Sequence, residues 1–167
     1  MRFKLTVEEV YVNSFDATEV GWTETGNSPY LQDTNTDYIR TNITLKYESK
    51  FGFPNSVGSG AINSVKIRVE VETIPFELGC EAYVYVWDGA SWVLLGKVYS
   101  DNVYAWIEFD VSAILNTWDK INGAKLRFLS SVGDGTVYVR RATRKVDYTV
   151  AAVSLKMVGD GLTCVVC

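Results

Sequence analysis

An unbroken alternation of apolar and polar residues over Ser64–Glu72 constrains the fold of this chain more than any other feature. Val65, Ile67, Val69 and Val71 occupy one set of positions, and polar or charged residues occupy the other. Because successive side chains of a strand point to opposite faces, this period of two predicts a strand with one buried and one hydrated face. The four apolar residues are therefore expected in the core.

The same alternation recurs along the chain and predicts about nine or ten strands. Asp88-Gly89, between two of them, is a strong signal for a tight hairpin. The predicted strands are Arg2–Tyr11, Asp37–Tyr47, Val65–Thr73, Glu81–Trp87, Trp92–Tyr99, Val103–Asp110, Lys125–Leu129, Thr136–Arg141 and Tyr148–Val158. Further side chains expected to face inward are Ile39, Ile43, Leu45, Val84, Val86, Ile107, Phe109, Leu126 and Phe128.

One segment, near 111–118, has helical spacing instead. Ile114, Leu115 and Trp118 recur at intervals of three or four, and either Asp110 or Ser112 can cap the first turn. We expect a short helix of about two turns there, closing one end of the fold.

Many short strands, one small helix and no alternation of strands with helices predict an all-β antiparallel sandwich of two sheets. A jelly roll fits this number of strands better than an immunoglobulin-like sandwich. The 167 residues are enough for one domain. We expect a jelly-roll-like domain over 1–158 and a C-terminal turn with a terminal strand or tail over 159–167.

The charge distribution argues against a nucleic-acid partner. The net charge is −4, whereas proteins that bind phosphate backbones are usually basic on one face. Basic residues gather at Arg140, Arg141, Arg144 and Lys145, which we interpret as a solvated turn or edge strand. No apolar run approaches the roughly 18 residues of a membrane span, so membrane insertion is not expected.

The residues at the N-terminus predict a strand instead of a secretory leader. Either the protein is made without a leader, as a virion protein released by host lysis is, or a leader has been removed upstream of Met1.

No catalytic constellation accompanies the strands. The chain contains no histidine, which excludes Ser-His-Asp, Cys-His and HExxH arrangements and makes a zinc site within one chain improbable. Glu70 and Glu72 are a candidate carboxylate pair, but a solvated strand face explains them better. The sequence predicts a non-enzyme without a cofactor. Asp33, Asn35 and Asp37 alternate in a way that suits calcium, and ordinary turn-forming side chains are the alternative.

The cysteines are too few for a disulfide scaffold, and the pairing of Cys80, Cys164 and Cys167 stays open. Cys164 and Cys167 form a C-x-x-C, but two valines separate them, which favours a strand over a redox helix. The uncharged, β-prone tail needs a partner strand. It pairs either with its own preceding strand through Gly159-Asp160-Gly161 or with the sheet edge of a neighbouring subunit. The candidate assembly residues are Leu162, Cys164, Val165, Val166 and Cys167.

Aromatic residues form the strongest candidate binding surface. Tyr83, Tyr85 and Trp87 share one face of a predicted strand, and Trp92 lies across the hairpin. If the opposite, aliphatic face is buried, these rings are either exposed, where they can stack on sugar rings, or covered by loops or another subunit.

Several segments resemble a jelly-roll domain common in phage structural proteins, in which a tryptophan and a small-residue turn precede an Asp and an Asp-Tyr-Ile strand start. Jelly-roll carbohydrate-binding modules are similar. The likeness spans about residues 10–158. It rests on Gly21–Gly26, Tyr30–Asp33, Asp37–Ile39, Ser64–Glu72, the Trp87–Trp92 hairpin and Phe109–Ser112.

The resemblance and the sequence together favour a non-enzymatic virion component: a decoration, capsid-associated, tail or fibre protein that binds itself or other structural subunits. The first alternative is a glycan-binding module that uses Tyr83, Tyr85, Trp87 and Trp92. The second is an extracellular filament or surface-layer subunit, and the sequon Asn42-Ile43-Thr44 gives that idea slight support. The expected localisation is the virion or, alternatively, an extracellular surface.

Overall fold

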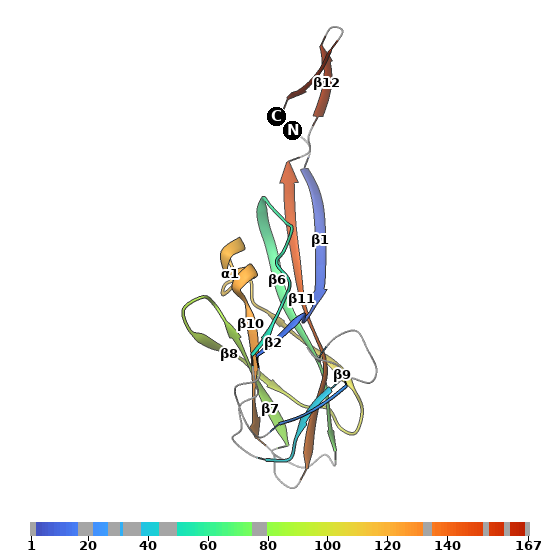
Figure 1. The fold of residues 1–167 in the computed structure, drawn as a ribbon, viewed down its shortest axis with the longest axis vertical. Helices are drawn as coiled ribbons and strands as arrows, with labels where there is room; N and C mark the ends of the chain where they lie inside the picture. The colour runs from blue at the N-terminus through green and yellow to red at the C-terminus, as the bar shows by residue number, and fades with distance from the viewer. Residues whose placement is uncertain are drawn as a thin grey trace.

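Two antiparallel sheets pack face to face in the computed structural model (Figure 1). It describes residues 3–16, 22–26, 31, 38–43, 50–74, 80–131, 135–151, 154–158 and 161–165, with the backbone alone for Asp16 and from residue 151 onward. The six-stranded sheet has the order β3 (Thr23–Thr25), β4 (Tyr38–Thr41), β11 (Thr136–Ala151), β6 (Ala61–Ile74) and β9 (Ala105–Asp110), with β1 (Phe3–Tyr11) also paired to β11. The five-stranded sheet has the order β2 (Ser14–Asp16), β5 (Lys50–Gly52), β10 (Lys125–Ser131), β7 (Glu81–Trp87) and β8 (Trp92–Val98). This confirms the all-β sandwich.

The apolar faces of the alternating strands meet between the sheets. All four valine and isoleucine positions of β6 from Val65 to Val71 are fully buried, and so are Val84 and Val86 of β7 and Leu126 and Phe128 of β10. The packing confirms the predicted faces of these strands, and a slip of one residue would have exchanged them.

Three of the expected core residues are less buried than predicted. Ile43 is 47% exposed, because β4 ends at Thr41 and the chain turns there, with the Ile43 amide donating to the Thr41 hydroxyl. Ile107 and Phe109 lie in β9, the edge of its sheet, and are only partly buried. Leu45 lies outside the described residues.

The two sheets touch along one side of the sandwich, where the edge strands β8 and β9 are in contact. Gly96 in β8 has a φ of 153° and follows a β-bulge, and a Cβ on it would lie 3.0 Å from the ring of Phe109. Glycine therefore lets the ring approach the strand backbone.

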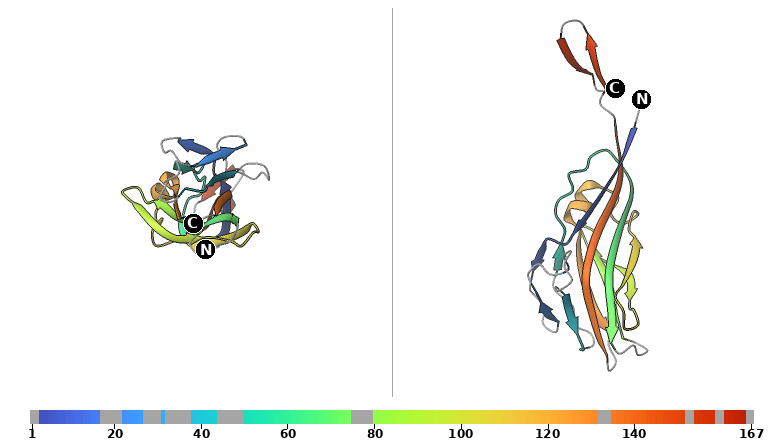
Figure 2. Two further views of the ribbon diagram at one scale, coloured as in Figure 1. Left: turned by 90° about the horizontal axis from the view of Figure 1, so that it is seen from below. Right: turned by 90° about the vertical axis from the view of Figure 1, so that its right-hand side faces the viewer.

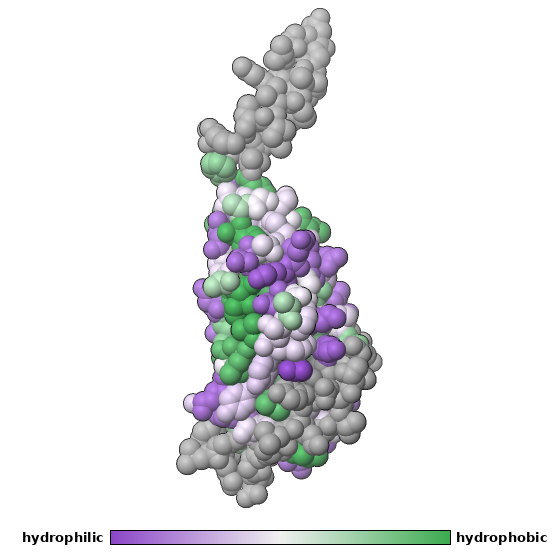
Figure 3. Space-filling view, turned by 90° about the vertical axis from the view of Figure 1, so that its left-hand side faces the viewer, coloured by the Kyte–Doolittle hydropathy of each residue, from purple (hydrophilic) through white to green (hydrophobic). Residues whose placement is uncertain are grey.

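Figure 3, which views the side where β8 and α1 lie in Figure 1, shows a lengthwise band of apolar surface.

Strand β11 is longer than predicted and corrects the interpretation of the basic cluster. The segments Thr136–Arg141 and Tyr148–Val158 were expected as separate strands, with Arg140 to Lys145 in a turn or on an edge. Instead, β11 runs unbroken from Thr136 to Ala151 and pairs with β6 on one side and with β4 and then β1 on the other. The basic residues thus lie in the middle of the six-stranded sheet.

Arg144 in β11 is fully buried, which is rare for an arginine. Its guanidinium donates to the carbonyls of Ile121 (2.6 Å) and Pro54 (2.9 Å) and lies 3.6 Å from the carboxylate of Glu8. Burial lowers the pKa of Arg144, and the Glu8 carboxylate opposes that shift. Arg144 thereby ties β1, the segment after β5 and the helix to one point of the sheet.

The short helix lies later than predicted. α1 spans Trp118–Gly123, with the Thr117 hydroxyl capping it and Ile121 buried beneath it. Between 111 and 118 the chain instead makes a single turn, with the Ile114 and Leu115 amides both donating to the Val111 carbonyl. This turn does not continue into α1, because the backbone of Thr117 is extended, with φ −134° and ψ 155°. In the described part of the chain, no helix is long and apolar enough to cross a membrane.

The tail pairs with the strand that precedes it. β12 (Ser154–Val158) and β13 (Gly161–Val165) form a separate two-stranded sheet in which Leu155 lies opposite Cys164. Figure 2 shows this hairpin standing clear of the sandwich beyond the end of β11. Leu162, Cys164 and Val165 thus lie in the hairpin that the first alternative predicted, while Val166 and Cys167 lie outside the described residues. The role of the tail in assembly stays a prediction. The division into domains at residue 158 stays a prediction.

Candidate ligand-binding face

The outer surface of the five-stranded sheet brings the predicted aromatic residues together. In β7, Ala82, Val84 and Val86 are fully buried, so alternation directs Tyr83, Tyr85 and Trp87 outward, where each is half-buried. Trp92 is the cross-strand partner of Trp87, and their ring centroids are 5.5 Å apart. The side chains are therefore neither fully buried nor fully exposed.

The hairpin that joins these strands is held by Asp88. Its Oδ1 accepts hydrogen bonds from the amides of Ala90 and Ser91, both at 2.8 Å, and Gly89 has a φ of 101°. These backbone bonds lower the pKa of Asp88. The turn therefore fixes the pairing of Trp87 with Trp92, as the Asp-Gly signal predicted.

Basic residues border the rings, and sequence reasoning missed them. Arg127 of β10 is the cross-strand partner of Tyr85, and its guanidinium carbon lies 4.6 Å from the Trp92 ring centroid and 5.6 Å from that of Tyr85. Lys125 lies on the same face of β10, because Leu126 between them is buried. We call the outward side chains Tyr83, Tyr85, Trp87, Trp92, Lys125 and Arg127 the aromatic face.

A cavity opens at one end of the aromatic face. It has a volume of about 220 Å³ and is lined by Lys50, Trp87, Trp92 and Lys125. Since a water molecule takes about 30 Å³ in the liquid, this is the space of a small cyclic ligand.

The opposite end of the aromatic face is closed by an ion pair. The Lys97 ammonium lies 2.9 Å from the carboxylate of Glu81 and also sits over the ring of Tyr99 at 5.8 Å. The hydrogen bond to Glu81 raises the pKa of Tyr83. Polar groups at this end already have partners, which leaves the Trp87 end as the more open part.

The outer surface of the six-stranded sheet is organised differently, around Glu70. A β-bulge at Arg140 gives two successive residues the same outward direction, and Arg140 and Arg141 each donate two hydrogen bonds to the Glu70 carboxylate at 2.6 to 2.8 Å. The carboxyl is 5% exposed, so the prediction of a solvated Glu70 was wrong. Burial by itself would raise its pKa, but the two arginines outweigh it and lower the pKa of Glu70 to about 2. Such a carboxylate is a structural counterion.

The rings of that surface are covered by arginines. The guanidinium of Arg140 lies 4.0 Å from the ring of Tyr104, while those of Arg68 and Arg141 lie 4.7 Å and 5.2 Å from the ring of Trp106. Burial, followed by the charge of Glu72, raises the pKa of Tyr104 to about 12.

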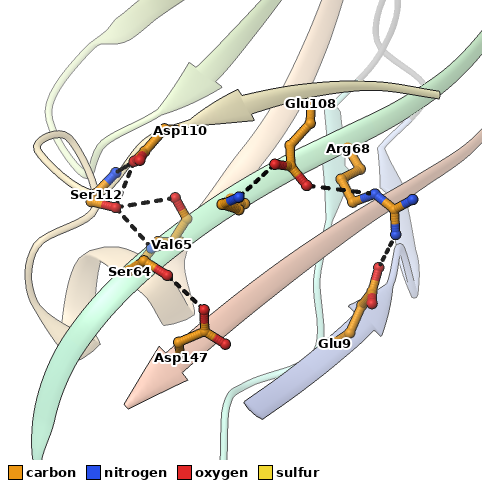
Figure 4. A network of polar contacts seen from close by, with 9 residues as sticks. Glu9, Ser64, Val65, Arg68, Glu108, Asp110, Ser112 and Asp147 are labelled. Carbon is orange, nitrogen blue, oxygen red and sulfur yellow. Dashed lines mark hydrogen bonds and ion pairs between the residues drawn. The ribbon is translucent and has the colours of Figure 1, made fainter.

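Farther along the same surface, ion pairs join β1, β6 and β9 (Figure 4). Lys66 and Glu108 are 2.6 Å apart, and Arg68 reaches both Glu9 at 2.9 Å and Glu108 at 3.8 Å. Opposite charges are matched here, so this surface offers a ligand fewer open groups than the aromatic face does.

Two other sequence features, the alternating acidic residues of the calcium prediction and the sequon at Asn42, are not assigned a binding site. Asp33, Asn35 and Asp37 lie outside the described residues, so the calcium idea stays a prediction. A second cavity of about 200 Å³ is lined by polar side chains and one isoleucine: Thr23, Arg40, Thr41, Asn42, Ile43 and Thr136. It contains Asn42 of the sequon but no aromatic ring.

Comparisons with known proteins agree on the architecture. Two structures of single-site mutants of a family 29 carbohydrate-binding module each align with a TM-score of 0.50 at 9% identity, covering 85% of this chain and 93% and 92% of theirs. No family model matches the sequence, and no curated protein does either. At this identity the likeness shows the fold alone, and it gives no support to a virion protein.

Proposed function

We propose that this protein is a non-catalytic carbohydrate-binding module whose ligand lies across the aromatic face. The observation that carries the proposal is the open cavity beside the paired indoles of Trp87 and Trp92, on the outer surface of the five-stranded sheet. A sugar ring presents C–H groups on its faces and hydroxyls at its rim. Indole rings suit the former, and neighbouring lysines and arginines can donate hydrogen bonds to the latter.

The architecture supports this proposal in a limited way. Family 29 carbohydrate-binding modules use a comparable sandwich, so the fold is compatible with glycan binding. The choice of the aromatic face as the binding surface rests on the side chains of this chain alone. The rings of Tyr104 and Trp106 on the other sheet are covered by guanidinium groups, whereas Trp87 borders an open cavity.

Affinity electrophoresis in gels containing polysaccharides tests the proposal. Trp87→Ala should weaken binding at least tenfold, which corresponds to about 1.4 kcal/mol, and leave the circular dichroism spectrum unchanged. Trp106→Ala is the matched control, because it removes the same ring from the opposite surface, and its binding should equal wild type. A folded wild type that binds no glycan contradicts the proposal, and equal loss in both variants contradicts the assigned face.

A self-associating structural subunit, on a virion or an extracellular surface, is the second candidate function. It is favoured by an exposed apolar stripe on the edge strand β1, where Phe3, Leu5 and Val7 are 63%, 66% and 53% exposed. Light scattering after size exclusion should then show oligomers that Leu5→Lys disrupts. A monomer at all concentrations contradicts this candidate.

A further inference from the structure

The lysines at the open end of the aromatic face differ in their surroundings from the paired cations Lys97, Lys66 and Arg68 of the two sheets. Lys97, Lys66 and Arg68 each lie beside a glutamate. Around the cavity, by contrast, Lys125 and Lys50 have no carboxylate within 4 Å among the residues whose side chains are described. Positive charge therefore collects here without a counterion from those residues, although the chain as a whole carries −4.

The strand pairing explains why Lys125 lacks an acidic neighbour across β5. Its cross-strand partner is Gly52, which has no side chain. Lys50 lies opposite the acidic residue Asp16 in the backbone register of β2 and β5, so the positive charge of the cavity depends mainly on Lys125. Asp88 lies in the adjacent turn, but two backbone amides already hold its carboxylate.

Arg127 continues the positive charge along the same strand. It is two residues from Lys125 on the outward face of β10, and its guanidinium lies over the Trp92 ring. A ligand that stacks on Trp87 in the cavity thus has the Lys125 ammonium beside it and the Arg127 guanidinium at the next outward position of β10. A guanidinium and an ammonium both bind carboxylate or sulfate oxygens, the former with two parallel hydrogen bonds.

We infer that the ligand of the aromatic face is an acidic polysaccharide, whose sugar rings carry carboxylate or sulfate groups. This inference rests on the proposed function and specifies its ligand class: the sugar rings stack on Trp87, and the anionic groups bind Lys125, with Arg127 at the next outward position of the same strand. Because these cations are at the surface, salt screens their attraction over about 8 Å at 0.15 M. Affinity for the acidic polymer falls as sodium chloride rises, while stacking of a neutral polymer changes little.

The test compares acidic polymers with neutral counterparts that have the same sugar backbone. Isothermal titration calorimetry of the full chain uses polygalacturonate and its fully methyl-esterified form, which have the same sugar backbone with and without negative charge. Dextran sulfate and dextran form the second pair and separate sulfate from carboxylate recognition. Wild type should bind at least one acidic polymer about tenfold or more tightly than its neutral counterpart.

Two lysine variants locate the effect. Lys125→Gln should lose most of the preference for the acidic polymer and keep its affinity for the neutral one. Lys97→Gln is the matched control, because it removes a lysine from the same sheet that is paired with Glu81, and its preference should equal wild type. Thermal melting of each variant establishes that it is folded.

The outcomes separate this inference from the proposed function. Equal binding of acidic and neutral polymers, unchanged in Lys125→Gln, overturns the inference and leaves glycan binding standing. A folded wild type that binds none of the polymers overturns both. Equally tight binding to single-stranded DNA shows a general polyanion surface and also overturns the inference.

Discussion

Single charged residues in this protein are stabilised by partners that are far away in sequence. Glu70 is held by Arg140 and Arg141, and Arg144 is held by two carbonyls and Glu8. A buried ion pair is weak evidence for net stability, yet removing one partner is costly because the other stays buried. The consequences are measurable at each of the two sites.

The first prediction concerns acid stability. The pKa of Glu70 falls from 4.5 in its ordinary environment to about 2 in the fold. Its stabilisation is therefore complete above pH 4.5 and is lost as the pH falls towards 2, a total of roughly 3 kcal/mol. Urea unfolding between pH 2 and 7 should show this loss in wild type.

The variant Glu70→Gln supplies the comparison. It has no carboxylate to protonate, so the free energy difference between it and wild type should shrink as the pH falls through the same window. A constant difference across that range would show that the arginines do not hold an ionised carboxylate.

The second prediction is that Arg144→Met destabilises the fold by about 3–5 kcal/mol, because it leaves the Glu8 carboxylate without its ion-pair partner and two carbonyl groups without their donor. The control is Lys145→Met on the same strand. Its side chain is only half-buried, and a surface change of this kind costs within about 0.5 kcal/mol. Chemical denaturation at neutral pH measures both, and equal midpoints for the two variants would contradict the assigned role.

Among the elements, strands with one buried face were predictable and the long central strand was not. The alternation of Val65 to Val71 and of Ala82 to Val86 located β6 and β7 and their inward faces. In β11 the bulge at Arg140 and the buried Arg144 interrupt the polar–apolar pattern, so local charge suggested a turn. Its continuity depends on pairing with β6 and β1, which lie far away in the sequence.

The candidate site was predictable in part for the same reason. Tyr83, Tyr85, Trp87 and Trp92 belong to one hairpin, so alternation and the Asp-Gly turn were enough to group them. Lys50 and Lys125 join them only through the strand order β5–β10–β7, which the local pattern does not contain. The cationic character of the face was therefore missed.

The third prediction concerns the β12–β13 hairpin. Its two strands pair only with each other in the described part of the chain. Deleting residues 152–167 should therefore change the melting temperature of the sandwich by less than about 2–4 °C, the shift expected from 1 kcal/mol in a protein of this size. Scanning calorimetry of the full and shortened chains measures this. A larger drop would show that the hairpin contributes to the sandwich core.

On the scale of the whole molecule, the two sheets have different outer surfaces. Ion pairs between glutamates and basic residues lie on the six-stranded sheet. On the five-stranded sheet, aromatic rings line a cavity together with two lysines that have no carboxylate partner among the residues whose side chains are described. The fourth prediction concerns salt. Raising sodium chloride from 0.05 to 1 M should weaken the binding of an acidic ligand to the five-stranded sheet far more than it lowers the stability of the fold. Exposed ion pairs contribute about 0–1 kcal/mol each, whereas the core is apolar. Parallel calorimetric titrations and melts at each salt concentration compare the two effects.

The pairing of β1 with β11 also determines how the molecule responds to mechanical load. Phe3 lies opposite Ala151, so the outer ends of both strands meet at one end of the sandwich (Figure 1). Tension between these two ends acts across the ladder, and its hydrogen bonds break one after another. Tension between the end of β11 and a polymer on the aromatic face instead pulls along the axis of β11. The strand can then move only if its hydrogen bonds to β6 and β1 break at the same time. Single-molecule pulling should record a low rupture force in the first geometry and a markedly higher one in the second. The sandwich should then resist a load applied through the proposed ligand better than a load applied between the two strand ends.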